Sequence, residues 1–187
     1  METSLKSLHF VLGLALVVML TNAITSYKFL KLQNQKSVTE TASTEVVEKQ
    51  LDCLAMNIYR EAGFEPFEGK VAVAQVTLNR VADTSGKFPK KVCEVVYQKN
   101  KFMEKVVCQF SWYCEHLKTP TVNKEAYDES YTVAKKVLLE GFRLDGLRSA
   151  LYYHADYINQ NWHLKRIMKI GQHIFYKGND DDETHAN

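Results

Sequence analysis

The sequence predicts an α+β domain that is mainly helical and carries a small antiparallel sheet near its C-terminal end. Apolar residues repeat at helical spacing over 51–62 and again after Pro66, which predicts two amphipathic helices. A third long helix is expected after Asn123. Two short aromatic-rich runs, Ala150–Ala155 and His173–Tyr176, are typical of strands. With 187 residues, 45% of them hydrophobic and 25% charged, the chain is expected to form one compact domain with appended segments.

The first two helices of the domain are bounded by residues that commonly stop or start helices. The first is expected to begin near Gln50 and to end at Glu61-Ala62, because Gly63 follows. Pro66 can open the second helix, since proline is favoured in the first helical turn. The run 83–89, which contains Asp, Ser, Gly and Pro, predicts the loop after it.

Two further helices are expected. Lys91–Tyr97 predicts a short one. Asn123 is a preferred N-cap residue for the long one, and Gly141 is its expected terminator. On either side of the domain, which is expected over 50–178, the stretch 27–49 predicts a solvated linker or a frayed helix. The acidic residues 179–187 predict a disordered tail.

The N-terminal segment has the pattern of a secretion signal. Lys6 precedes the apolar run Phe10–Leu20, and the small residues of Thr21–Ala23 follow where a signal peptidase can cut. Residues 1–26 are therefore expected to be a signal peptide. An uncleaved anchor in the inner membrane is the alternative, because Leu8–Ile24 is nearly long enough to span a thin bilayer. Both interpretations place the domain outside the cytoplasm, in the periplasm or facing the cell wall.

The four cysteines suit disulfides in such an oxidising compartment. Cys108 and Cys114 are close enough in sequence to close a small loop, which leaves Cys53 and Cys93 to pair. Three connectivities are possible, and the sequence does not choose among them.

Glu61 is the residue whose position suggests chemistry. At about 100° per residue, it lies close to Leu54 and Ile58 on a helical wheel, at the border of the apolar face. Partial desolvation and the negative end of the helix dipole both raise the pKa of a carboxyl there. A general acid at neutral pH needs such a raised pKa. Most glutamates are ordinary surface residues, so position alone does not assign this role.

Several sequence blocks around and after Glu61 carry a family resemblance. They are, in order, Cys53–Ala62, Glu65-Pro66, Gly69–Val81, Phe88-Pro89, Val92–Tyr97, Cys108–Trp112, Ala150–Ala155, Trp162 and Ile170–Tyr176. The ordered set resembles the SleB-like cell wall hydrolases, the spore-cortex lytic enzyme family. Two departures occur: the family usually has Arg-Gly where this chain has Gly63-Phe64, and Lys70 replaces a common glutamine. Glu65, which precedes a helix, is expected to be a capping or turn residue rather than a catalytic one.

The resemblance implies a lysozyme-related catalytic domain that cleaves peptidoglycan glycan strands between N-acetylmuramic acid and N-acetylglucosamine. Glu61 would protonate the glycosidic oxygen and then deprotonate the muramyl 6-hydroxyl, which closes a 1,6-anhydro ring without a second carboxylate. No metal or cofactor is expected. The net charge of +2 gives no basic field for nucleic acid. We expect a monomer that contacts a membrane only through its N-terminal segment.

The same blocks supply side chains that can bind the glycan. Hydrogen bonds are expected from four of them and stacking on sugar faces from two tryptophans, although core packing is an equal alternative for each aromatic residue. His173 is expected to be a buried sheet histidine rather than a proton-transfer group. The expected binding residues are Gln109, Ser111, Trp112, Tyr152, His154 and Trp162.

Other functions remain as alternatives. A zinc amidase or peptidase would need ligands such as His154, His163 and His173, which have no metal-motif spacing. A Cys–His peptidase would use Cys53 as nucleophile, which a disulfide would prevent. An inactive wall-binding module is the non-enzyme alternative. Roles in cell lysis, as for an endolysin, in wall remodelling and in germination are all compatible with the sequence.

Overall fold

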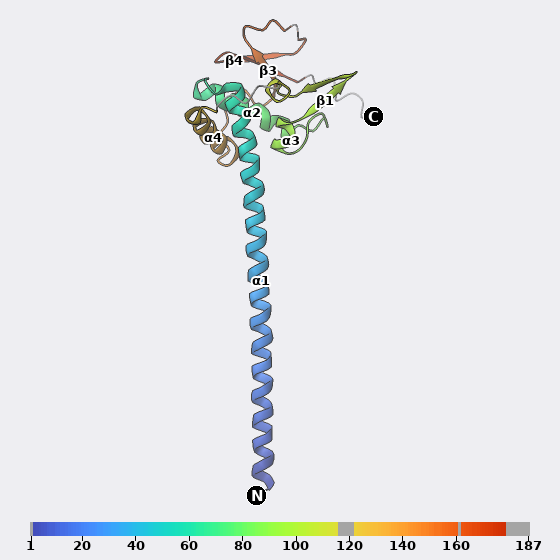
Figure 1. The fold of residues 1–187 in the computed structure, drawn as a ribbon, viewed down its shortest axis with the longest axis vertical. Helices are drawn as coiled ribbons and strands as arrows, with labels where there is room; N and C mark the ends of the chain where they lie inside the picture. Colours follow the sequence, from blue (N-terminus) through green and yellow to red (C-terminus); the bar gives the residue numbers. More distant parts are fainter. Residues whose placement is uncertain (1, 116–121, 161, 179–187) are drawn as a thin grey trace. The chain divides into compact units, whose positions relative to one another are not determined.

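The computed structural model describes residues 2–115, 122–160 and 162–178. The chain divides into two compact units, with the boundary between Val46 and Val47, close to the predicted domain start at Gln50. The helices are α1 (Glu2–Ala62), α2 (Phe67–Ala82), α3 (Val92–Val96), the 3₁₀ turn η1 (Ser111–Tyr113) and α4 (Lys124–Leu138) (Figure 1). The strands are β1 (Lys99–Phe102), β2 (Lys105–Cys108), β3 (Ala150–Ala155), β4 (Arg166–Ile170) and β5 (His173–Lys177). This content confirms the mainly helical α+β class.

The helix α1 is longer than the helix expected from about Gln50 to Ala62. It begins at Glu2, so residues 27–49 are helical, which agrees with the helix of the two alternatives expected there. The physical reason is that no glycine or proline interrupts the chain between residues 14 and 62. In this first unit the described side chains of 16–33 are exposed.

Parts of the predicted terminal segments cannot be compared with the structure. The side chains of residues 1–12, 14 and 15 lie outside the described residues, as does the predicted tail 179–187. Within the residues that are described, no helix combines the length and the apolar character that a membrane crossing requires.

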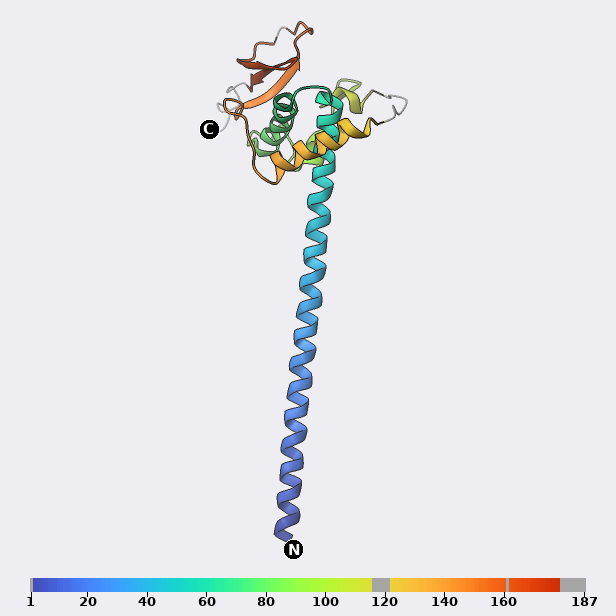
Figure 2. The ribbon, with the colours of Figure 1, turned by 90° about the vertical axis from the view of Figure 1, so that its left-hand side faces the viewer.

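In the second unit, α2 is the central helix. It contacts α3, α4 and β3, and it lies between α4 and the three-stranded sheet (Figures 1 and 2). Its Val and Ala side chains are buried on two sides. On one side they join apolar residues of α1, α3 and α4, such as Leu54 and Val137. On the other side, Ala72 and Val76 meet Leu147 and Phe175.

The predicted end signals of the helices agree with the structure. Asn123 caps α4, and its Oδ1 accepts a hydrogen bond from the backbone N–H of Ala126 at 3.0 Å. Gly141, with φ of 73°, follows the last turn of α4 in the left-handed region that glycine adopts readily. Gly63 follows α1, and a Cβ there would clash with the carbonyl oxygen of Tyr59. A side chain at the position of the family's usual arginine would therefore not fit this turn.

The larger sheet has the antiparallel order β3-β5-β4. Its strands β3 and β5 are the two that the sequence predicts, and they pair Tyr153 with Phe175 and His154 with Ile174. The strand β4 and the β1–β2 hairpin are not predicted. The lysines of β1 and β2, most of whose described side chains are exposed, and the charged Arg166 and Lys169 of the half-buried β4 hide the apolar alternation that identifies a strand. The hairpin turn uses Met103 at φ of 54° rather than a recognisable Asn-Gly pair.

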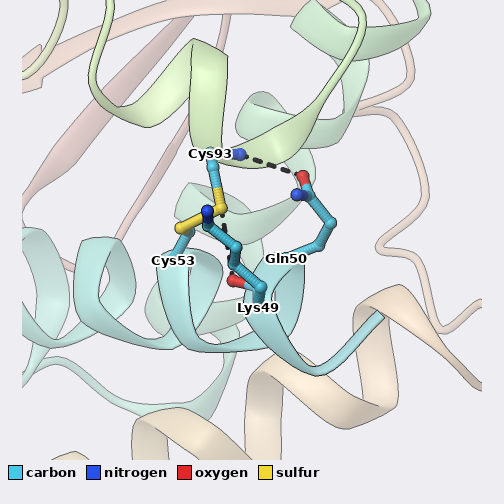
Figure 3. Close-up of a disulfide and its surroundings, with 4 residues drawn as sticks. All are labelled: Lys49, Gln50, Cys53 and Cys93. Carbon is cyan, nitrogen blue, oxygen red and sulfur yellow. Dashed lines mark hydrogen bonds between the residues drawn. A yellow bond between two sulfur atoms is a disulfide. The ribbon is translucent and has the colours of Figure 1, made fainter. Parts of the chain in front are cut away.

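Two disulfides join the cysteines as Cys53–Cys93 and Cys108–Cys114, and no cysteine is free. The first links the end of α1 to α3 (Figure 3). There the backbone N–H of Cys93 donates to Oε1 of Gln50 at 3.1 Å, and its Sγ lies 3.2 Å from the carbonyl oxygen of Lys49. Cys53 therefore carries no thiol that could serve as a nucleophile.

Candidate active site

Glu61 lies half-buried in the last turn of α1, facing β3. The hydroxyl of Tyr153 donates a hydrogen bond to Oε2 of Glu61 at 2.9 Å. Burial raises the pKa of Glu61, the hydrogen bond from Tyr153 and the charge of Arg80 oppose that rise, and the charge of Glu115 adds to it. The net direction is upward, which agrees with the desolvation expected from the helical wheel.

One turn before Glu61, Asn57 holds an aromatic residue beside the same face of α1. Asn57 is fully buried and its Nδ2 donates to the hydroxyl of Thr77 at 3.2 Å. Its Oδ1 accepts from the indole N–H of Trp112 at 3.1 Å. Trp112 also lies 6.0 Å from the rings of Tyr97 and Tyr113, so its orientation is fixed by several contacts.

Trp112 belongs to the loop that the Cys108–Cys114 disulfide closes. The same loop carries Gln109, whose backbone N–H donates to the carbonyl of Gln98, and the exposed Ser111 at the start of η1. Three of the six expected binding residues thus share one covalently closed segment.

Polar residues of α2 hold the segment that leads into β3. Nε2 and Oε1 of the buried Gln75 bond the carbonyl and N–H of Leu144 at 3.2 and 2.8 Å. Nδ2 of Asn79 donates to the carbonyls of Leu147 and Ala150 at 2.8 and 2.9 Å. These bonds attach the backbone of residues 144–150 to α2, and they fix where β3 begins. Sequence reasoning did not single them out, although polar side chains within a run of Val and Ala are a recognisable signal.

Arg80 connects the closed loop with β3. Its Nε donates to the carbonyl of Leu151 at 2.8 Å. Its guanidinium lies over the rings of Phe110 and Tyr152, 5.0 and 6.0 Å from their centroids. The side chain is buried, and its Nη1 has no hydrogen-bond partner among the described residues. Aromatic faces and the Leu151 carbonyl thus hold a positive charge whose field reaches Glu61.

The other three expected binding residues come together on the sheet. Trp162 lies 6.3 Å from the ring of Tyr152 and 5.2 Å from that of His154. Nδ1 of His154 lies 2.8 Å from the carbonyl of Ala155 and therefore donates to it. Nε2 lies 2.9 Å from the hydroxyl oxygen of Tyr176, within hydrogen-bonding distance. Both ring nitrogens are engaged, which is the arrangement of a sheet histidine that positions its neighbours.

Glu65 has a structural position in the turn after α1. Its carboxylate accepts the backbone N–H of Gln172 at 3.2 Å, in the turn between β4 and β5. Nζ of Lys70 donates to the carbonyl of Glu65 at 3.0 Å and to Oε2 of Glu129 at 2.9 Å. The lysine that replaces the family's usual glutamine thus stabilises this turn. The position of Glu65 fits the expected turn role.

His173 lies beside Tyr153, and it is one of the residues considered as a metal ligand. His173 is buried edge-on against Tyr153 with ring centroids 5.1 Å apart, and burial lowers its pKa. Across residues 2–115, 122–160 and 162–178, no three His, Cys, Asp or Glu side chains are grouped in a way that could hold a metal ion.

Comparison with known proteins gives relatives of one kind. A spore cortex-lytic enzyme of Bacillus cereus is 33% identical to this chain over 134 residues, which cover 70% of this chain and 45% of that enzyme. The spore cortex-lytic enzyme of Bacillus subtilis strain 168 is 29% identical over 149 residues, which cover 78% of this chain and 43% of that enzyme. The chain therefore spans less than half the length of these relatives.

Structure and family comparisons agree with the sequence relatives. The crystal structure of the catalytic domain of the Bacillus cereus SleB protein matches with a TM-score of 0.50 and 29% identity, covering 70% of this chain and 91% of that domain. The sequence family described as Cell Wall Hydrolase matches residues 64–176, beginning just after Glu61. The chain belongs to this cell wall hydrolase family.

Proposed function

We propose that this protein is a peptidoglycan-cleaving enzyme of the lytic transglycosylase type, with Glu61 as its acid and base. The observation that carries the proposal is the half-buried carboxyl of Glu61, whose pKa is raised by burial and whose Oε2 accepts the Tyr153 hydroxyl. Such a group is protonated over a wider pH range than a surface glutamate, so it can act as a general acid.

The proposed reaction needs one carboxyl. Glu61 donates its proton to the glycosidic oxygen as the bond from that oxygen to the muramyl C1 breaks. The muramyl 6-hydroxyl then attacks C1, and Glu61 takes the hydroxyl proton. The nucleophile is part of the substrate, so the step gains the advantage of an intramolecular reaction. The charge of Arg80 and the Tyr153 hydroxyl stabilise the carboxylate between the two proton transfers.

The relatives support the substrate class. The matching enzymes are named as spore cortex-lytic, and the matching family is described as cell wall hydrolases. The glycan would contact the closed loop with Gln109, Ser111 and Trp112 and the sheet group with Tyr152, His154 and Trp162. The exposed part of Trp162, 37% of its surface, suits stacking on a sugar face.

The protein is further proposed to act as an exported monomer. Two disulfides suit an oxidising compartment, and the N-terminal segment has a secretion pattern. Sequencing the N-terminus of protein isolated from its host distinguishes a cleaved signal from a retained anchor.

The decisive experiment is mass spectrometry of the products from purified peptidoglycan, with wild-type protein and Glu61→Gln side by side. We expect 1,6-anhydromuramyl fragments from the wild type, unaffected by chelator, and almost none from the variant. Products that incorporate labelled oxygen from water would instead indicate hydrolysis. Glu115 would then be the first candidate for a second carboxylate, because its charge reaches Glu61. Free stem peptides that disappear with chelator would favour a zinc amidase and overturn the proposal.

A further inference from the structure

We infer that Tyr153 is a positioning residue for Glu61: by donating to Oε2 it leaves Oε1 as the oxygen that delivers the proton and later takes one back. This inference rests on the proposed function, and it assigns a separate task to each oxygen of the carboxyl. Tyr153 is not among the residues that the sequence singles out.

The direction of the hydrogen bond follows from the partners. A protonated carboxyl has one O–H donor and one carbonyl oxygen that only accepts. Among the described residues, Oε2 of Glu61 is the hydrogen-bond partner that the Tyr153 hydroxyl has. If Oε2 carried the proton and donated to the phenol, the phenolic proton would be left without an acceptor in residues 2–115, 122–160 and 162–178. The phenol therefore donates, and the carboxyl proton stays on Oε1.

The hydroxyl is held in place without substrate. The Tyr153 ring packs 5.5 Å from the ring of Phe175 and 5.1 Å from that of His173, both from β5. Phe175 is fully buried, and it is the register partner of Tyr153 in the β3–β5 pair. Packing and strand pairing thus preorganise the donor.

The phenol also keeps its proton through the reaction cycle. Burial and the charge of Glu61 hold the pKa of Tyr153 well above its ordinary value. It therefore remains a donor when Glu61 is neutral and when Glu61 is ionised, and it does not compete as a base. When Glu61 is ionised the same bond stabilises the carboxylate, which is why it opposes the rise in the pKa of Glu61.

The charged and titratable groups around this pair come from several elements. Arg80 of α2 lowers the pKa of both partners, Glu115 beyond η1 raises that of Glu61, and His173 of β5 touches the Tyr153 ring. None of these groups is changed when only the phenolic oxygen is removed. The effect of that removal on the Glu61 titration can therefore be attributed to the lost bond.

The test is Tyr153→Phe, which keeps the ring packing and removes the donor. With purified peptidoglycan as substrate, we expect kcat to fall about tenfold, the size of one hydrogen bond, with KM little changed. The basic limb of the pH profile should move to higher pH, because the group that lowers the pKa of Glu61 is gone. Tyr131→Phe serves as the matched control, because it removes a hydroxyl from a half-buried tyrosine of α4. It should change neither kcat nor the position of the basic limb.

Two results would overturn the inference. One is an unchanged kcat and pH limb in Tyr153→Phe; the other is a loss of activity that follows a loss of stability in urea without any shift of the limb, which would indicate a structural role. The proposed function is tested separately by Glu61→Gln. If that variant is inactive while Tyr153→Phe behaves as wild type, the proposed function stands and only the positioning role fails. If Glu61→Gln is fully active, the assignment of the acid itself fails.

Discussion

Replacing both cysteines of the Cys53–Cys93 disulfide with alanine is expected to lower the free energy of unfolding by about 4 kcal/mol. The two residues are 40 apart in sequence, so the bond closes a long loop in the unfolded chain and removes much of its entropy. The Cys108–Cys114 bond spans only 6 residues, and the same relation gives about 2 kcal/mol for its loss.

The second disulfide makes a matched control, since each bond has one buried and one half-buried cysteine. The two double alanine variants should therefore lose similar packing and differ in loop entropy. Urea unfolding followed by circular dichroism, with a common slope, gives the two free energies. Equal losses, or a larger loss for Cys108→Ala/Cys114→Ala, would refute the loop-length reasoning and would indicate that local contacts of the closed loop dominate.

Three further predictions concern stability and its pH dependence. Burial raises the pKa of Glu61 above 4.5, so the folded state loses stability as pH rises from about that value; Glu61→Gln should therefore raise the melting temperature at neutral pH, with no gain once the pH is below the ordinary carboxyl pKa. A gain that is equal at both pH values would contradict this. Gly171→Ala should destabilise the domain by about 1–3 kcal/mol, because φ is 55° there and a Cβ would overlap the Glu65 carboxylate. Calorimetry of the double variant Gly171→Ala/Glu65→Ala should find that part of this lost stability is recovered. Asn79→Ala should cost about 2 kcal/mol in urea, since it removes one donor from the Ala150 carbonyl and one from the Leu147 carbonyl, which keeps only the Ala150 N–H; a loss below half of that would mean that water replaces the amide.

Features that depend on neighbours in sequence can be predicted. The helix ends at Gly63 and Asn123 follow from local capping chemistry, and the position of Glu61 at the apolar border follows from helical periodicity. The two aromatic strands are predictable because β3 and β5 are partly buried and carry the residues that strands favour. Local sequence is a sufficient guide wherever local interactions determine the structure.

Features that depend on distant contacts escape sequence reasoning. The bond between Tyr153 and Glu61 joins residues 92 positions apart, and no pattern near either residue indicates it. The side-chain hydrogen bonds of Gln75 and Asn79 join residues 68 to 71 positions apart in the chain. Sequence reasoning did not decide between a linker and a helix over 27–49, because polar residues without periodicity fit both. The absence of glycine and proline there is the signal that favours the helix.

The position of β5 in the sheet has a consequence for how the protein is made. Among the described residues it is the last strand in sequence order, yet it is the central strand of its sheet, paired with β3 and β4. The three-stranded sheet cannot assemble before residues 173–177 have left the ribosome. Because Phe175 and His173 pack on the Tyr153 ring, the proposed acid also lacks its finished surroundings until then. The order of synthesis thus places the completion of the sheet, and of the surroundings of Glu61, after residues 173–177 have been made.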